Sequence, residues 1–308
     1  MQKQLEDILH EVGKVIKGKE NEKEIILAAI LAEGHILLDD IPGVGKTSLA
    51  MAFSKAMEME ANRMQFTSDV LPADVVGFNM IRPDGRKEYQ SGVILCNLFL
   101  ADEINRASSK TQSALLEVME EKRVTVEGIT TPAPKPFVVI ATQNPVGSVG
   151  TQLLPDSQVD RFMICLTLGY PSHSEEIMVL KERQGINPAD QVVQVVTRDE
   201  LLRMQEQIKK VHIDEDIYDY IVSLSEHTRV HQFLQMGMSP RGTIALMELS
   251  KALAFMNERS CVFPEDVRKA FPYIAKHRIY LTAKAKVEKH EKDEVIRDIL
   301  ERCQVKQG

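Results

Sequence analysis

Hydrophobic positions along the chain follow two different spacings. Between about residues 35 and 170, short apolar runs alternate with stretches in which apolar residues recur at helical spacing. This alternation is typical of a parallel β-sheet with helices on its faces. The runs that we predict to be strands span residues 35–39, 62–66, 97–102, 137–142 and 162–168.

The part of the chain after Pro171 is predicted to be helical. Its apolar residues recur every three or four positions, and signals for strands are few. Turn-forming residues at 184–188 interrupt the helical pattern. We therefore expect two domains, an α/β domain over residues 1–185 that opens with a helical stretch, and an all-helical domain over residues 186–308.

Composition narrows the class of protein. Hydrophobic residues make up 44% of the chain and charged residues 27%, as in ordinary soluble globular proteins. The longest apolar runs, 26–32 and 93–101, are shorter than the roughly 20 residues that cross a bilayer. The N-terminal residues carry mixed charge and no apolar block, so they do not resemble a secretory signal, and we expect a cytoplasmic location. The net charge of -7 disfavours nucleic acid as the main partner, because such binding depends on neutralising phosphates.

A glycine-rich turn follows the first predicted strand. Its last three residues, Gly45, Lys46 and Thr47, fit the end of the P-loop pattern G-x-x-x-x-G-K-[ST] and precede a helical run. Glycines let backbone N–H groups face a phosphate, the lysine reaches the β- and γ-phosphates, and the hydroxyl can ligate Mg²⁺. Asp40 replaces the first glycine of the pattern, which leaves the alternative of a plain glycine-rich turn. The residues expected to hold the nucleotide phosphates are Pro42, Gly43, Val44, Gly45, Lys46, Thr47 and Ser48.

Polar side chains also follow two other predicted strands. The apolar run 98–101 ends in Asp102 and Glu103. We expect Asp102 to order the coordination shell of Mg²⁺ and Glu103 to act as the base for an attacking water molecule. Asn144 follows the next strand, where it could hydrogen-bond that water or the γ-phosphate. The alternatives are surface polarity for the two acids and a simple Asn-Pro turn for Asn144.

Seven segments together resemble the AAA+ ATPases, and within them the MoxR family, over essentially the whole chain. The segments are residues 40–47, 65–74, 101–107, 110–117, 141–145, 154–162 and 168–171. The resemblance implies an AAA+ αβα domain with a central, mostly parallel five-stranded sheet, followed by an all-helical lid. It also implies Mg-dependent hydrolysis of ATP. The chain has no N-K-x-D guanine signature, which agrees with ATP rather than GTP.

The resemblance assigns roles to further residues. Asn144 matches the sensor 1 residue, and Arg161 matches the arginine finger, a fixed planar cation that stabilises charge on the transferring phosphoryl group. An ion pair with Asp160 or Asp156 is the alternative for Arg161. Arg241 matches the sensor 2 position, and whether it acts on its own protomer or on a neighbour stays open. Ile16 and Gly18 lie in the segment that lines the adenine in this family.

Two hairpins are also expected. Asp84-Gly85 between strand-like flanks predicts a hairpin turn at about residues 76–92, which corresponds to the helix-2 insert of this AAA+ branch. Alternating residues predict a second hairpin at about 122–136, before the sensor 1 strand. In a ring both would point toward one face or the pore and could couple hydrolysis to a partner. The alternative is that they are inert.

The leading functional hypothesis is a ring-forming ATPase that does conformational work on a protein client. A finger that acts in trans needs a neighbouring subunit, and family analogy favours a hexamer. The resemblance implies chaperone-like assembly or metal-cofactor maturation of client complexes, with a separate von Willebrand factor A domain protein as a possible partner. The alternatives are remodelling of nucleic acid and a nucleotide-controlled scaffold that hydrolyses slowly.

Overall fold

The computed structural model of the chain describes residues 2–41, 43–144, 154–182 and 188–304. Its centre is a five-stranded sheet in the order β2-β5-β8-β1-β9, with every neighbouring pair parallel. The strands are β1 (Ile36–Asp39), β2 (Ala61–Gln65), β5 (Leu98–Asp102), β8 (Val138–Gln143) and β9 (Ile164–Leu166). All five lie within the runs that the hydrophobic pattern indicates or differ from them by one residue, so the predicted α/β fold class is confirmed.

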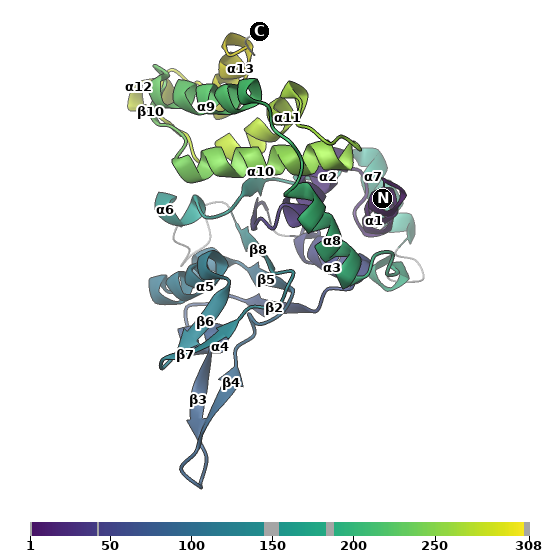
Figure 1. The fold of residues 1–308 in the computed structure, drawn as a ribbon, viewed down its shortest axis with the longest axis vertical. Coiled ribbons are helices and arrows are strands. Elements are labelled where there is room, and N and C mark those ends of the chain that lie inside the picture. Colours follow the sequence, from purple (N-terminus) through teal and green to yellow (C-terminus); the bar gives the residue numbers. More distant parts are fainter. Residues whose placement is uncertain (1, 42, 145–153, 183–187, 305–308) are drawn as a thin grey trace.

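Helices cover both faces of this sheet (Figure 1). On one face, α1 (Gln2–Val15), α2 (Glu20–Leu31) and α3 (Lys46–Ala56) bury apolar side chains together with Leu100 and Ile140. On the other face, α5 (Ser109–Glu121) shares a core with Phe99 and Val139. Successive residues of each central strand therefore point to opposite cores, which explains why these strands are apolar throughout.

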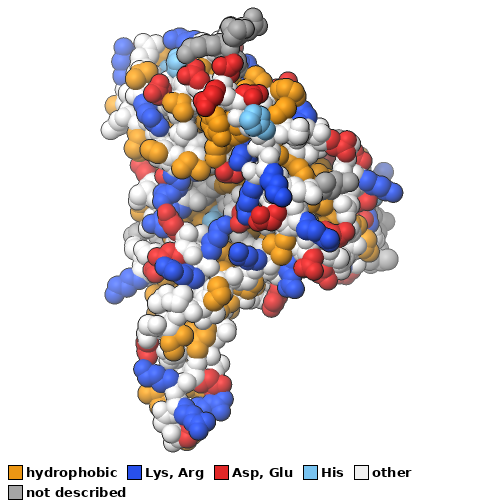
Figure 2. Space-filling view, in the orientation of Figure 1, with side chains coloured by type: hydrophobic (Ala, Val, Ile, Leu, Met, Phe, Trp, Pro, Cys, Tyr) orange, Lys and Arg blue, Asp and Glu red, His pale blue; other side chains and the backbone are white. Residues whose placement is uncertain are grey.

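Two antiparallel hairpins extend the α/β part. They are β3 (Gly77–Ile81) with β4 (Lys87–Ser91), which follow α4 (Pro72–Val76), and β6 (Arg123–Val126) with β7 (Ile129–Pro132). The β3–β4 hairpin projects from the body as an arm (Figures 1 and 2). Lys87 and Glu127 form an ion pair of 2.7 Å between the two hairpins, which ties the arm to its neighbour.

The rest of the chain is mainly helical. Two short helices, α6 (Asp156–Val159) and α7 (His173–Glu182), flank β9, and the expected domain boundary at 184–188 lies almost wholly outside the described residues. The elements beyond it are α8 (Arg198–Ile208), α9 (Glu215–Val230), β10 (Leu234–Met236), α10 (Pro240–Met256), α11 (Pro264–Ala275), β11 (Tyr280–Leu281), α12 (Ala283–Val287) and α13 (Lys292–Arg302). The apolar core of these helices is continuous with the core of α1–α3. Within the described ranges, none of the helices has the length and apolar character that a membrane span requires.

Candidate functional site

The P-loop lies between β1 and α3. Gly43 and Gly45 have φ angles of 86° and 91°, a left-handed conformation that glycine adopts without strain. A Cβ atom on Gly43 would meet nothing within 4 Å, so the space beside the loop is open. Lys46 is the first residue of α3, and Thr47 and Ser48 complete its first turn. The positive end of this helix therefore faces the loop, as in sites that bind phosphate groups.

Asp40 fixes the start of the P-loop. One carboxylate oxygen accepts a hydrogen bond from the Ile41 N–H at 2.8 Å, and the other accepts from the N–H groups of Leu168 at 2.5 Å and Gly169 at 2.9 Å. Asp40 is not among the residues with positive φ, so the glycine of the general pattern is not needed here. Its side chain instead joins the loop to the segment that follows β9.

The side-chain amide of Asn144, just after β8, connects the first residue of α3 to the residue that follows β5. Its oxygen accepts a hydrogen bond from the Lys46 ammonium at 3.0 Å, and its nitrogen donates to Glu103 at 2.8 Å. Lys46 also donates to the backbone oxygen of Asp40 at 2.7 Å. Burial lowers the pKa of Lys46, while nearby carboxylates, Asp40 first among them, oppose this shift. The arrangement places a cation, an amide and a carboxylate next to the loop.

Asp102 and Glu103 are held by different partners at the end of β5. Asp102 accepts a hydrogen bond from the Thr142 hydroxyl at 2.6 Å and pairs with Arg63 of β2 at 2.7 Å. Glu103, with a φ of 56°, donates its backbone N–H to the same hydroxyl at 2.9 Å and pairs with Arg106 at 2.8 Å. The two carboxylates therefore point to different surroundings, which allows them different roles.

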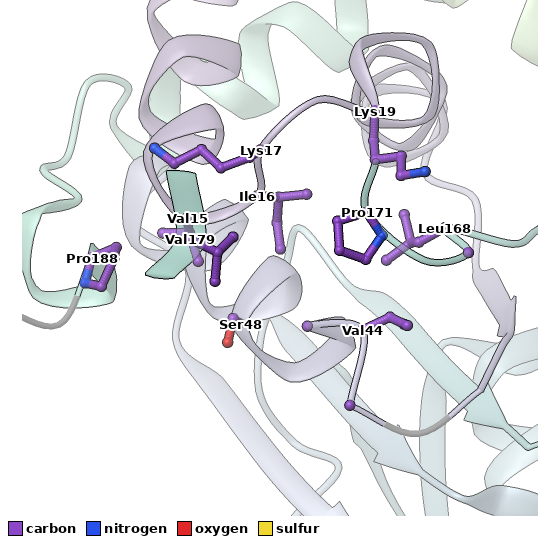
Figure 3. A pocket seen from close by; sticks show the side chains of 13 residues that line it. Val15, Ile16, Lys17, Lys19, Val44, Ser48, Leu168, Pro171, Val179 and Pro188 are labelled. Atoms are coloured by element: carbon purple, nitrogen blue, oxygen red, sulfur yellow. The ribbon is translucent and has the colours of Figure 1, made fainter. Parts of the chain in front are cut away.

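A cleft of about 150 Å³ lies beside the P-loop (Figure 3). Ile16 lies at its centre, between the loop and the segment that contains Leu168 and Pro171. Gly18 has a φ of 66°, a left-handed conformation that favours glycine, and it lies next to the carboxylate end of the Glu175 side chain on α7. The walls combine apolar side chains, among them Ile16 and Pro171, with Lys17 and Lys19, and the apolar part can pack against a planar base.

Arg161 and Arg241 form a second cluster around Glu120 of α5. Both pair with Glu120, Arg161 at 2.8 Å and Arg241 at 2.6 Å, and Arg241 also pairs with Asp160 at 3.3 Å. The ion pair considered for Arg161 with Asp160 or Asp156 is therefore not the one that forms. Figure 1 shows α6, just before Arg161, on the opposite side of the molecule from α1 and α7, which frame the cleft.

The structure thus brings together most of the predicted site residues. Pro42 lies outside the described part of the chain. The sequence interpretation missed three residues that contact the site, namely Arg63, Arg106 and Thr142. Thr142 could have been found as a polar residue near the end of an apolar strand, whereas nothing local marks Arg63.

Comparisons with known proteins agree with this geometry. Residues 35–164 match the ATPase family associated with various cellular activities (AAA), and residues 226–299 match the AAA lid domain. The chain is 37% identical to Chaperone MoxR1 of Mycobacterium tuberculosis, with 96% of this chain and 81% of the relative covered. It is 42% identical to the uncharacterized protein YeaC of Bacillus subtilis, with 96% and 92% covered.

A solved structure extends the likeness to three dimensions. The crystal structure of a proposed ATPase from Cytophaga hutchinsonii superposes with a TM-score of 0.92 at 36% sequence identity. The superposition covers 99% of this chain and 96% of the other.

The contacts of Asp40 generate a prediction about stability. Asp40→Asn leaves one acceptor oxygen and turns an amide donor toward backbone N–H donors, so it should lower the free energy of unfolding by about 1–3 kcal/mol. Urea titration measures this change. Asp216→Asn, at an exposed position on α9, is the matched control and should stay within about 0.5 kcal/mol of the native protein. Equal stability of both variants would contradict the role given to Asp40.

Proposed function

This chain belongs to the MoxR family of AAA+ ATPases, and we propose that it hydrolyses Mg-ATP at the interfaces of a ring, most simply a hexamer, to remodel client proteins. The observation that carries the proposal is the separation of its charged groups into two clusters. Lys46, Glu103 and Asn144 lie beside the nucleotide cleft, whereas Arg161 and Arg241 are gathered by Glu120. One protomer then supplies the cleft and its neighbour supplies the arginines.

Arg241 belongs with the finger in this proposal. It comes from the start of α10 in the helical part of the chain, yet it shares the carboxylate of Glu120 with Arg161. A residue that acted on its own protomer's nucleotide would lie near Lys46 instead. We therefore propose that Arg241 acts in trans, on the nucleotide of the neighbouring protomer.

The residues of the cleft suit ATP. The apolar walls around Ile16 can hold the adenine, and the backbone of Gly43 to Gly45 with the N-terminus of α3 can hold the phosphates. Lys46 donates to Asp40 and Asn144 in this structure, and both acceptors are weaker than a phosphate oxygen. Its ammonium can therefore turn to the β- and γ-phosphates when ATP binds.

The donor set beside the loop also suits Mg²⁺. The Thr47 hydroxyl and the Asp102 carboxylate are hard oxygen ligands, and among the described residues no group of three or more His, Cys, Asp or Glu side chains is arranged for a metal. Such a site relies on phosphate oxygens and water for its other ligands. Bound Mg²⁺ would neutralise charge on the phosphates. Thr142 and Arg63 hold the Asp102 carboxylate in place for this role.

Glu103 is the candidate base. Its carboxylate is held by Asn144 and by Arg106, whose side chain is 43% exposed. A pair this exposed contributes only about 0–1 kcal/mol, so Glu103 can leave Arg106 and turn toward an attacking water molecule. The hydrogen bond to Asn144 links this movement to the lysine, because the same amide contacts both groups.

The projecting arm favours a protein client over nucleic acid. Phe78, Met80 and Ile81 are exposed along β3, and exposed apolar groups of this kind mark surfaces that bind proteins. The basic residues of the arm, Arg82, Arg86 and Lys87, are each paired with an acid, namely Glu88, Asp84 and Glu127. Their charge is therefore largely neutralised, and Figure 2 shows both signs at the tip.

Tyr89 adds to this argument. Its hydroxyl donates to the backbone oxygen of Val76 at 2.5 Å, so the ring lies against the arm and is not free to stack on a base.

The name of the Mycobacterium tuberculosis relative, Chaperone MoxR1, also suits work on proteins. The presence of Glu103, Asn144 and Arg161 together disfavours the alternative of a binding scaffold that hydrolyses ATP only slowly. Assembly or metal-cofactor maturation of a client complex, with a separate von Willebrand factor A domain protein as partner, fits this proposal.

Replacing the candidate base tests the chemistry. Glu103→Gln keeps the size of the side chain and one acceptor oxygen for Asn144 but removes its basicity, so turnover should fall by about 10²–10⁴-fold while ATP still binds. The oligomer should persist longer because ATP is not consumed. Steady-state ATPase assays, ATP binding and gel filtration measure these effects. Glu226→Gln, exposed on α9, is the control and should leave turnover unchanged; normal turnover of Glu103→Gln would exclude Glu103 as the base.

Mixing defective protomers tests the shared site. Arg161→Ala should lose about 10³-fold or more in turnover, because a finger arginine stabilises the transition state. Adding Glu103→Gln protomers, which keep their finger but lack the base, should restore part of the activity. Arg297→Ala, exposed on α13, should retain normal turnover. If mixed rings form and no activity returns, a finger that acts in trans is ruled out.

A further inference from the structure

Arg278 is a buried arginine in the turn after α11. It is 4% exposed, and its guanidinium makes five hydrogen bonds. Its acceptors are a carboxylate oxygen of Asp160 at 2.8 Å and the backbone oxygens of Asp160 at 2.9 Å, Phe162 at 2.6 Å, Met163 at 3.0 Å and Ile274 at 2.8 Å. A guanidinium has five N–H donors, so every donor is used.

Four of these five acceptors lie in one short segment, residues 160–163. This segment connects α6 to β9 and contains Arg161, whose own side chain points to Glu120 and to the backbone oxygen of Leu116 at 3.1 Å. Arg278 therefore binds the backbone on both sides of the candidate finger without contacting the finger itself. His277 adds a contact from its Nε2 to the Phe162 oxygen at 3.2 Å.

Asp160 collects further groups from the helical part of the chain. The Ser239 hydroxyl lies 2.8 and 2.9 Å from its two carboxylate oxygens, and Arg241 lies 3.3 Å away. Gly242, in the first turn of α10, makes room for Arg278, because a Cβ atom there would lie 2.7 Å from the Arg278 Cδ. The start of α10 and the end of α11 thus converge on the residue before Arg161.

Buried ion pairs are poor sources of net stability, since apolar side chains of similar volume often serve a core as well. What a planar, fully bonded guanidinium provides is a fixed geometry for the atoms that it contacts. Here those atoms belong to the backbone that carries the finger, while the arginine belongs to the lid. The contact is therefore placed to transmit movement of the lid to the finger.

We propose that Arg278 is a positioning residue that fixes the finger segment to the lid, so that the lid of one protomer sets the position of the arginine offered to its neighbour. This inference rests on the proposed trans action of Arg161. The lid of one protomer then regulates the hydrolysis of ATP that is bound to the next protomer. Arg278 itself needs no contact with nucleotide.

Arg278→Lys tests the proposal with charge retained. An ammonium has three donors and no planar fork, so it cannot hold all the acceptors in place. Turnover should fall about 100-fold, the cost of misplacing a catalytic group by about 1 Å, while the KM for ATP stays within about threefold. Arg268→Lys, an exposed arginine on α11, is the matched control and should change neither constant. Normal turnover of Arg278→Lys would overturn the proposal.

The decisive readout is rescue in mixed rings. Adding Glu103→Gln protomers to Arg278→Lys should restore turnover, because the variant keeps its own cleft and receives an intact finger from its neighbour. Rescue of Arg161→Ala without rescue of Arg278→Lys would overturn the positioning role and leave the proposed function standing. Failure of both in confirmed mixed rings would remove the proposed function as well.

A second variant covers the case in which Arg278→Lys does not fold. Gly242→Ala keeps every charge and favours the helix, yet its methyl group displaces the Arg278 side chain. It should show the same loss of turnover and the same rescue by Glu103→Gln. Full activity of Gly242→Ala, with circular dichroism and gel filtration like those of the native protein, would overturn the proposal.

Discussion

The parallel pairing of β5, β8 and β1 is the constraint on which the site depends. Parallel strands that pair in register end at the same edge of their sheet, and here Asp39 lies opposite Gln143 while Ala101 lies opposite Ala141. The residues that follow these three strands therefore meet, although they are far apart along the chain. The amide of Asn144 then joins Lys46 to Glu103, and it can do so in only one orientation, with its oxygen toward the ammonium.

Much of the fold could be predicted because its signals are local. Five strand-like runs, four of them mainly apolar, indicated the strands of the central sheet, and the glycine-rich turn before a helical run indicated the P-loop, since both depend on residues that are neighbours in sequence. The side chains at the strand ends could be predicted for the same reason. Once the strands are placed in a parallel sheet, their carboxyl ends must lie at the same edge of the sheet.

The rest could not be predicted because it depends on long-range contacts. Arg63 sits in an edge strand where it resembles an ordinary exposed cation, and only the pairing of β2 with β5 brings it to Asp102. Local sequence suggested Asp160 or Asp156 as partners for Arg161, whereas the folded chain brings it to Glu120 on another helix. Asp40 looked like a defect in a glycine pattern, but one of its carboxylate oxygens accepts a hydrogen bond from Leu168, 128 residues away. Contacts between residues this far apart in sequence are determined by tertiary packing and not by the local propensity for helix or strand.

The separation of the charged groups into two clusters supports the proposal that the active site is shared between protomers. In the proposed shared site, the cleft of one protomer holds a lysine and a base, and Arg161 and Arg241, which Glu120 holds, act on the phosphates of the neighbouring protomer. Arg278 and Asp160 connect the second cluster to the lid. Under the proposal of a shared site, this contact links the conformation of each protomer to hydrolysis on its neighbour, and hydrolysis depends on assembly.

The most direct measurement is therefore the ATPase rate per protomer as a function of protein concentration, with the oligomeric state followed in parallel by light scattering. A site shared between neighbours should give a low rate for dilute, dissociated protomers and a steep rise as the oligomer forms. A rate per protomer that is the same for dissociated and assembled protein would contradict a site shared between neighbours.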